Sequence, residues 1–377
     1  MVEIPNPLDL VDRVRRDIER NALRVRNGVR LVAGSPAKVG LTPNDVVWES
    51  GRARLTRYHL PGVAQRFSPP LVIVYSLVSR SYIFDLCPGN SFVETLLTEG
   101  FDVYVLDFGI PDERDADNKL EDYVDGYIPA ALRRAATLSG SNDVNLVGYC
   151  LGGILAILFA ARDRRGLIHS LTALAAPVDL SKQGAFSEMF ENGRIEVDAI
   201  VDDSGNIPAS VMSQSFKLLK PTADVSRYAN LLDRMWNDEY VHAYQLMTYW
   251  NSDHVPFPGA VARQGVEMLI RRNGLMTGRV VLGGEAVDLG RIVCPTLVVV
   301  ADKDHIVPPP SAVPLMDLIG ASNKELLGLP TGHVGLFVGK SAAKPTIPRL
   351  VVYFRRHTSP STDHQNEQSA NHHGMEP

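Results

Sequence analysis

The stretch NLVGYCLGGI, Asn145–Ile154, decides the fold of this chain. An apolar run of strand length ends here in Gly-x-Cys-x-Gly, and an apolar run suited to a helix follows. Gly148 and Gly152 lack side chains, so the chain can turn sharply and hold Cys150 exposed in a strained geometry. Gly153 lets the following helix pack closely. The stretch therefore predicts a strand–turn–helix corner that presents a thiol as a nucleophile.

Two backbone amides near this corner are candidates to stabilise an oxyanion. The amide of Leu151 lies at the start of the predicted helix, and the N-terminus of that helix also favours a thiolate on Cys150. The second amide in such sites comes from the loop after the third strand, which here includes Val78. Taken alone, the motif also fits a small buried thiol in a turn. Other residues are therefore needed to distinguish a catalytic nucleophile from a structural thiol.

The bulk composition fits a globular chain with one large core. Of its 377 residues, 45% are hydrophobic and 21% are charged, so a single α/β core with an insertion accommodates the length. A net charge of −5 argues against nucleic-acid binding. The three cysteines show no paired spacing, so neither a disulfide framework nor a metal site is expected.

The sequence also lacks the patterns of secretion and of membrane insertion. The N-terminus has no basic start followed by an apolar run, and the apolar run Leu151–Ala161 is too short to span a bilayer. We therefore expect a cytoplasmic setting.

Short apolar runs alternate with helical patterns along most of the chain. The run NSFVETLLTEG predicts a helix that is capped at Asn90 or Ser91 and stops at Gly100. Such alternation is typical of a mostly parallel sheet with helices on both faces. Two early strands are expected in the stretch TPNDVVWESGRARLTRYHL, and further strands at 71–78, 101–108, 143–149, 170–177, 295–302 and about 325–329.

We expect four regions. The segment 178–290 interrupts the alternation and has aromatic and aliphatic residues at helical spacing. The tail is almost devoid of aliphatic residues. The regions are an N-terminal region, 1–30, with an amphipathic helix over 7–25; an α/β core, 31–177 and 291–356; an inserted and mainly helical cap, 178–290; and a disordered tail, 357–377.

Two later stretches supply an acid and a base for the thiol. VVVADKDHIVP ends a strand with carboxylates in the following loop, and LPTGHVGLF places His333 after another strand. The order nucleophile, acid, histidine is that of the α/β-hydrolase fold, which we predict. The acid lies in a loop beyond the strand end, which favours Asp304 over Asp302. His305 is an alternative base, although a loop histidine beside Asp304 is the simpler interpretation.

These motifs resemble those of the poly(3-hydroxyalkanoate) synthases, above all the short, two-component type. The resemblance covers residues 15 to 355. It is carried by GYCLGG at 148–153, DHIVP at 304–308 and GHVG at 332–335, and by NALRVRNGVR (21–30), LTPNDVVW (41–48), SRSYIFDLCPGNS (79–91), LDFGIP (106–111), LEDYVDGYI (120–128), NLLDRMWNDEYV (230–241), FPGAVARQ (257–264) and NGLMTGRVVLGGEAVDLGRIVCPTL (273–297).

The resemblance implies specific roles and partners. Cys150 would be the covalent nucleophile, His333 the general base and Asp304 the third catalytic member. The substrate would be a 3-hydroxyacyl-coenzyme A; the coenzyme is part of the substrate and its leaving group, so no separate cofactor is implied. A second synthase subunit, a homodimer and the surface of a growing polymer granule are the partners that it implies.

A thiol suits this reaction because the substrate is itself a thioester. Transfer of the acyl group to Cys150 exchanges one thioester for another, so the activation needed for polymerisation is retained. Asp304 either activates the substrate hydroxyl directly or only orients His333. Because water competes for the acyl-enzyme, we expect a buried nucleophile that is reached by a tunnel under the cap.

Two other functions remain open at this stage. A thioesterase or a small-molecule acyltransferase would share all three catalytic residues. A non-catalytic homologue at the granule surface would have no need for Cys150, Asp304 and His333 together.

Overall fold

The computed structural model describes the chain except residues 1–6, 34–37, 192–194, 219–222, 340–341 and 361–377. The chain forms two compact units. The first comprises Met1–Val39 and Lys220–Asp253, and the second comprises Gly40–Leu219 and His254–Pro377.

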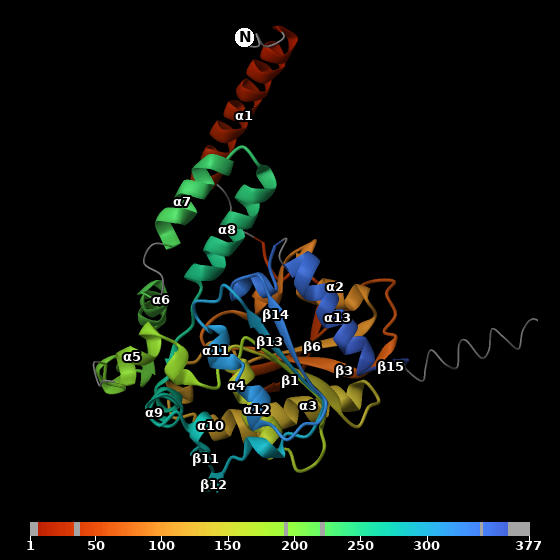
Figure 1. Cartoon of the computed structure of the whole chain (residues 1–377), viewed down its shortest axis with the longest axis vertical. Coiled ribbons are helices and arrows are strands. Elements are labelled where there is room, and N and C mark those ends of the chain that lie inside the picture. The colour runs from red at the N-terminus through yellow and green to blue at the C-terminus, as the bar shows by residue number, and fades with distance from the viewer. Residues whose placement is uncertain (1–6, 34–37, 192–194, 219–222, 340–341, 361–377) are drawn as a thin grey trace, which may run out of the picture. The chain divides into compact units, whose positions relative to one another are not determined.

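The second unit is built around a mostly parallel sheet (Figure 1). The strand order is β1-β2-β6-β3-β7-β8-β13-β14. β1 and β2 are antiparallel to their neighbours, the strands from β6 to β14 run parallel, and the short β15 adds antiparallel pairs to the start of β3. The strands are β1 Asn44–Ser50, β2 Ala53–Tyr58, β3 Phe67–Val74, β6 Phe101–Asp107, β7 Val144–Tyr149, β8 Ile168–Leu174, β13 Thr296–Ala301, β14 Lys324–Leu329 and β15 Ser359–Pro360.

Helices cover both faces of this sheet. Strands β7 and β13 are buried along their whole length, as expected for parallel strands between two helical layers. Helices α3 and α4 pack together and against β7, whereas α2 contacts α13 and β6. The helices are α2 Phe92–Thr98, α3 Ile128–Leu138, α4 Leu151–Arg162 and α13 Ile347–Arg356, with the short α11 Pro309–Ala312 and α12 Leu315–Leu318 between β13 and β14.

Local sequence signals set the ends of these elements. Helix α2 begins after Ser91, whose side chain accepts a hydrogen bond from the amide of Glu94, the usual N-cap arrangement. Gly100 follows the helix with a φ of +93°, a conformation that glycine adopts without strain. The sequence therefore predicted this helix and its cap correctly.

The segment between β8 and β13 is mainly helical, and its parts belong to both units. Residues 220–253 lie in the first unit and the remainder in the second. The elements of the second unit here are α5 Ala185–Glu191, β9 Asn206–Ile207, α6 Ala209–Leu218, β10 Phe257–Pro258, α9 Gly259–Gly265, a π-helical turn at Val266–Arg271, α10 Gly274–Thr277, β11 Val281–Leu282 and β12 Glu285–Ala286.

The first unit consists, within the described residues, of α1 Pro7–Ala33, α7 Ala223–Arg234 and α8 Asp238–Ser252. Asn27 makes polar contacts between the helices of this unit and is 1% exposed. The Asn27 amide donates to the Met235 carbonyl and to Asp238, both at 2.8 Å. Arg26 pairs with the same Asp238 carboxylate at 2.5 Å. One buried amide thus ties α1 to the start of α8.

Most predicted elements are present, with shifts at their ends. All the predicted strands form, and the parallel sheet with two helical layers is confirmed. The N-terminal helix continues to Ala33, beyond the predicted end at residue 25. Most of the predicted disordered tail lies outside the described residues, but Ser359–Pro360 at its start form β15.

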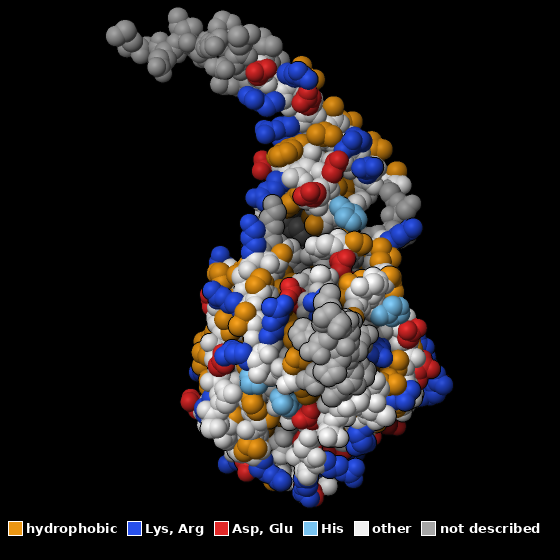
Figure 2. Space-filling view, turned by 90° about the vertical axis from the view of Figure 1, so that its right-hand side faces the viewer, with side chains coloured by type: hydrophobic (Ala, Val, Ile, Leu, Met, Phe, Trp, Pro, Cys, Tyr) orange, Lys and Arg blue, Asp and Glu red, His pale blue; other side chains and the backbone are white. Residues whose placement is uncertain are grey.

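Charges of both signs are present on the face of the molecule shown in Figure 2. Figure 2 shows Lys and Arg side chains interspersed with acidic and apolar ones over the face it presents. None of the described helices combines the length and apolar character that a bilayer-spanning helix requires.

We expect Asn27→Ala to destabilise the first unit by about 2 kcal/mol, because the Met235 carbonyl and Asp238 lose a buried donor. Hydrogen exchange of the α1 and α8 amides measures this change. The matched control is Asn21→Ala on the same helix, since the exposed Asn21 accepts a hydrogen bond from Arg24 and its loss should change the stability by no more than about 0.5 kcal/mol. Equal protection in both variants would contradict the role of Asn27.

Candidate active site

The candidate site lies where three parallel strands end. Cys150 follows β7 directly and is the N-cap of α4. Its φ is +54°, a conformation that costs a non-glycine residue about 1–3 kcal/mol. The Cys150 amide donates to the Leu174 carbonyl at 3.0 Å, and the Cys150 carbonyl accepts from Gly153 at 2.9 Å. Hydrogen bonds to β8 and α4 thus maintain the strained backbone conformation of Cys150.

The three glycines around Cys150 are required by close packing. A Cβ on Gly148 would lie 2.7 Å from the Ala156 Cβ, and one on Gly153 would lie 2.4 Å from the Ala176 Cβ. A Cβ on Gly152 would lie 2.4 Å from the Val74 carbonyl oxygen. Any side chain at these positions would push α4 away from the sheet. Gly148 and Gly152 were predicted for a sharp turn, but neither has a positive φ, whereas the close packing predicted for Gly153 agrees with its contact to Ala176.

Asp304 lies in the loop after β13, and both of its carboxylate oxygens have hydrogen-bond partners. Its Oδ1 accepts from the amides of Ile306 and Val307, both at 2.8 Å. Its Oδ2 lies 2.6 Å from His333 Nδ1. The Asp304 carboxylate is fully buried, whereas Asp302 is exposed. Of the two predicted candidates, only Asp304 therefore contacts His333.

Backbone bonds between two loops bring His333 to Asp304. Strands β13 and β14 pair in register, and the loops that follow them stay in contact: Lys303 donates its amide to Thr331 at 2.9 Å, and Asp302 donates to Leu329 at 2.8 Å. His333 lies in the loop after β14 and is 9% exposed. His305, the alternative base, is exposed.

Electrostatics link His333 to both partners. Burial alone lowers the pKa of His333, but the charge of Cys150 and the hydrogen bonds that the ring makes to Asp304 and Cys150 outweigh this effect and raise the pKa to about 10. Because Nδ1 is engaged by Asp304, Nε2 is the ring nitrogen left for Cys150. The structure thus brings the three predicted residues together as thiol, imidazole and carboxylate.

One aromatic side chain packs against the His333 ring and a second packs against the first; neither was predicted from the sequence. The Tyr149 ring lies 4.8 Å from the His333 ring at 33°, and Phe337 packs edge-on against Tyr149 at 4.6 Å. Tyr149 is 2% exposed. Its place directly before the nucleophile was the only signal in the sequence.

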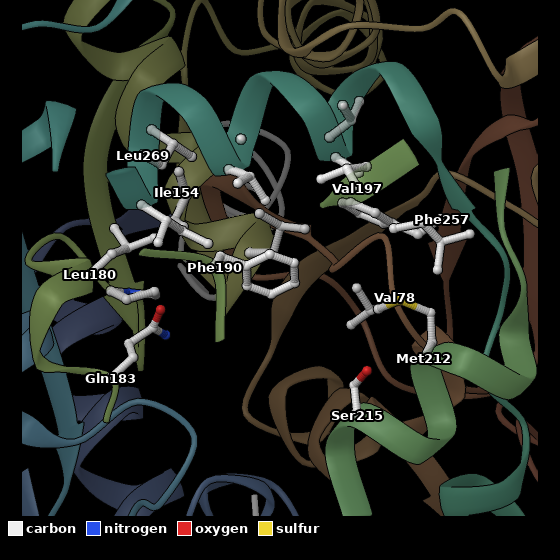
Figure 3. Close-up of a pocket in the computed structure, with 18 of the residues that line it drawn as sticks. Val78, Ile154, Leu180, Gln183, Phe190, Val197, Met212, Ser215, Phe257 and Leu269 are labelled. Atoms are coloured by element: carbon white, nitrogen blue, oxygen red, sulfur yellow. The ribbon is translucent and has the colours of Figure 1, made fainter. Parts of the chain in front are cut away.

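An apolar pocket in the second unit opens beside Cys150 (Figure 3). Its volume is about 180 Å³. Side chains from α4, α6 and the π-helical turn at Val266–Arg271 point into it, among them Ile154, Met212 and Leu269. Polar side chains are few in this lining, namely Cys150, Gln183 and Ser215. The pocket suits an apolar ligand with a small number of polar groups.

Cys150 is half-buried rather than fully buried, which corrects the expected burial of the nucleophile. The cause is the pocket, which reaches the thiol side chain and leaves part of it accessible. Val78 and Leu151, the predicted oxyanion residues, line the same pocket as Cys150.

The other two cysteines have different surroundings. Burial raises the pKa of Cys294 to about 11. Burial, aided by the Asp85 carboxylate, also raises the pKa of Cys87. Both are protonated thiols near neutral pH. In the part of the chain that the structure describes, no group of three or more His, Cys, Asp or Glu side chains could hold a metal ion.

Comparisons with known proteins identify the family. Residues 69–340 match the family model of the alpha/beta hydrolase fold. The chain is 32% identical to the poly(3-hydroxyalkanoate) polymerase subunit PhaC of Allochromatium vinosum, over 91% of this chain and 98% of the relative. It is 33% identical to the subunit of that name from Haloferax mediterranei, over 87% of this chain and 67% of the relative.

The chain belongs to the poly(3-hydroxyalkanoate) polymerase family. Among solved structures, a lipase candidate from Sulfolobus solfataricus matches with a TM-score of 0.55 at 16% identity, covering 86% of this chain and 97% of that one. This likeness shows the fold alone. Both the predicted α/β-hydrolase fold and the predicted family are confirmed, and membership of a polymerase family on this fold supports an enzyme.

We expect the His333 imidazole to remain protonated in the folded protein well above its ordinary pKa of 6.5. NMR titration of the imidazole measures this pKa directly. Asp304→Asn and Cys150→Ser should each lower it, because each removes a group that stabilises the imidazolium. The matched control Asp302→Asn changes an exposed carboxylate and should leave the pKa of His333 unchanged. A wild-type value near 6.5 would contradict the coupling.

The same pKa shift fixes the sign of a stability effect. Because the folded-state pKa of His333 is raised, its contribution to stability is fully present below pH 6.5 and is lost as pH rises through about 10. The free energy of unfolding of wild type minus that of His333→Gln, from urea titrations, should therefore shrink between those pH values.

Proposed function

We propose that this protein polymerises 3-hydroxyacyl-coenzyme A into poly(3-hydroxyalkanoate) through a covalent thioester on Cys150. The observation that carries the proposal is the chain of contacts at the pocket: the Asp304 carboxylate lies 2.6 Å from the His333 ring, and the charge of Cys150 raises the pKa of that ring. Membership of the polymerase family supports the substrate class.

The first step transfers the acyl group to the enzyme. The Cys150 thiolate, paired with the His333 imidazolium, attacks the thioester carbonyl. The backbone amides of Leu151 and Val78 stabilise the oxyanion. The carbon–sulfur bond to coenzyme A then breaks, and the leaving thiolate takes the proton from His333. One thioester replaces another, so the acyl group keeps its activation.

The second step lengthens the chain. The hydroxyl of one acyl unit attacks the thioester carbonyl on Cys150, and an ester bond forms as the carbon–sulfur bond breaks. The hydroxyl proton moves to His333, which restores the thiolate–imidazolium pair. Water competes with that hydroxyl at this step. The apolar lining of the pocket disfavours water and supports transfer over hydrolysis.

The proposal extends to the assembly in which the chain acts. We infer a second synthase subunit, a homodimer of this chain, and a location in the cytoplasm at the surface of polymer granules. The relatives are named as subunits of a polymerase, which supports a multi-subunit enzyme. Size-exclusion chromatography with light scattering, with and without a candidate second subunit, tests this assembly.

Replacing Cys150 by alanine should lower the rate of coenzyme A release from 3-hydroxybutyryl-coenzyme A by at least about 10⁴-fold, because removal of the nucleophile disables the whole triad. A thiol-reactive dye measures the released coenzyme, and solvent extraction measures the polymer. Cys87→Ala and Cys294→Ala are matched controls that should retain activity. Coenzyme release with free acid and no polymer in the wild type would indicate a thioesterase instead.

Asp304→Asn separates two roles for the carboxylate. If Asp304 only orients His333, acylation and elongation should fall together, by about 10⁴-fold as in serine-type triads. We expect this result, because Asp304 contacts His333 through Oδ2 while both bonds of Oδ1 are made to backbone amides. Rapid acylation of Cys150 without elongation, seen by mass spectrometry, would instead assign Asp304 to the substrate hydroxyl.

A further inference from the structure

Gln183 places an unpartnered hydrogen-bond acceptor at the pocket beside Cys150. Gln183 is 8% exposed, and its Oε1 is buried with no hydrogen-bond partner among the described residues. The pocket that Gln183 lines is otherwise almost wholly apolar. Figure 3 shows its side chain below Leu180, with the amide oxygen on the side that faces Leu180. An unpartnered acceptor in an apolar pocket can be satisfied by a hydrogen-bond donor on a bound ligand.

The orientation of this amide is fixed by its other end. Gln183 Nε2 donates to the Ile306 carbonyl at 3.3 Å, and Ile306 in turn donates its amide to Asp304. With Nε2 engaged by a carbonyl, Oε1 is the group left to accept. The amide is therefore held by the same loop that holds the carboxylate partner of His333.

The remaining polar side chains of the pocket are already committed. The Ser215 hydroxyl donates to the Val211 carbonyl of its own helix at 3.0 Å, and Cys150 interacts with His333. A buried acceptor without a partner carries a free-energy cost, because it has lost its hydrogen bonds to water. A ligand that donates a hydrogen bond to Gln183 recovers this cost, whereas a purely apolar ligand does not.

We propose that Gln183 Oε1 accepts a hydrogen bond from the 3-hydroxyl group of the acyl chain, so that the pocket selects 3-hydroxyacyl over plain acyl thioesters. The inference takes the substrate class from the proposed function and adds the residue that recognises the 3-hydroxyl group. A hydroxyl at this position is a donor close to the reacting carbonyl, and the acyl chain that carries it must enter the pocket shared by Cys150 and Gln183. Gln183 positions this group and determines specificity.

The test is a binding comparison that needs no turnover. The full-length Cys150→Ala protein is titrated calorimetrically with 3-hydroxybutyryl-coenzyme A, butyryl-coenzyme A and 3-methoxybutyryl-coenzyme A. The hydroxyl ligand should bind about tenfold more tightly than the other two, because only it can donate to the buried acceptor. This comparison alone keeps the proposal testable if a Gln183 variant does not fold.

Adding Gln183→Leu should reduce that tenfold preference to about one. The matched control is Ser215→Ala, since the hydroxyl of Ser215 is engaged within its helix and its loss should leave the preference intact. No preference in the starting protein would overturn the inference. An equal loss of affinity for all three ligands in Gln183→Leu would also overturn it, because that result assigns Oε1 to an amide of the coenzyme.

The outcome for Gln183 is separable from the outcome for polymerisation. If the tenfold preference is found and lost with Gln183→Leu, but wild type yields free 3-hydroxy acid without polymer, the specificity role of Gln183 stands and the polymerase proposal fails. If wild type makes polymer while the preference is absent, the reverse holds.

Discussion

The parallel pairing of β13 with β14 is the constraint on which the candidate site depends. In-register pairing brings the ends of the two strands to one edge, and the bond from Lys303 to Thr331 keeps the following loops together. Asp304 lies three residues after β13 and His333 four residues after β14. The pairing of the two strands brings the Asp304 carboxylate to within 2.6 Å of the His333 imidazole. Strand β8 lies between β13 and β7, so the nucleophile reaches the same edge of the sheet. Sites in open α/β sheets occur at this carboxyl edge for the same reason.

A second constraint acts at Cys150, where backbone strain and helix packing are coupled. The positive φ of Cys150 is maintained by the close packing of α4 on the sheet. Gly148, Gly152 and Gly153 allow this packing, because a Cβ at any of the three positions would clash. The resulting half-buried thiol lies at the N-terminus of a helix, which favours negative charge. It also faces an imidazole whose pKa is raised. Packing thus fixes the thiol beside the imidazole with which it interacts.

Patterns local in sequence predicted much of this molecule, and contacts between distant segments account for what they missed. The strands and the cap of α2 follow from apolar runs and from Ser91, and the order Cys150, Asp304, His333 pointed to the fold. Tyr149 and Gln183 were missed because their partners, His333 and Ile306, are more than a hundred residues away. Asn27 was missed for the same reason, since it bonds to Asp238 across the sequence. Close packing was predicted for Gly153, but Gly148 and Gly152 were predicted for a turn, and they too are required by the spacing between α4 and the sheet.

The loop from Asp304 to Val307 connects the chemistry with the selection of the ligand. Its amides at Ile306 and Val307 fix the carboxylate of Asp304, while the carbonyl of Ile306 fixes the amide of Gln183. A ligand hydroxyl bound at Gln183 would therefore be positioned by the same short backbone segment as Asp304, the carboxylate partner of His333. Because the hydroxyl has a single proton, its hydrogen bond to Gln183 must break before that proton moves to His333 during elongation. Placement to within an ångström matters for such transfers. A loop that bonds to both Asp304 and Gln183 places the two side chains relative to one another through a few backbone atoms.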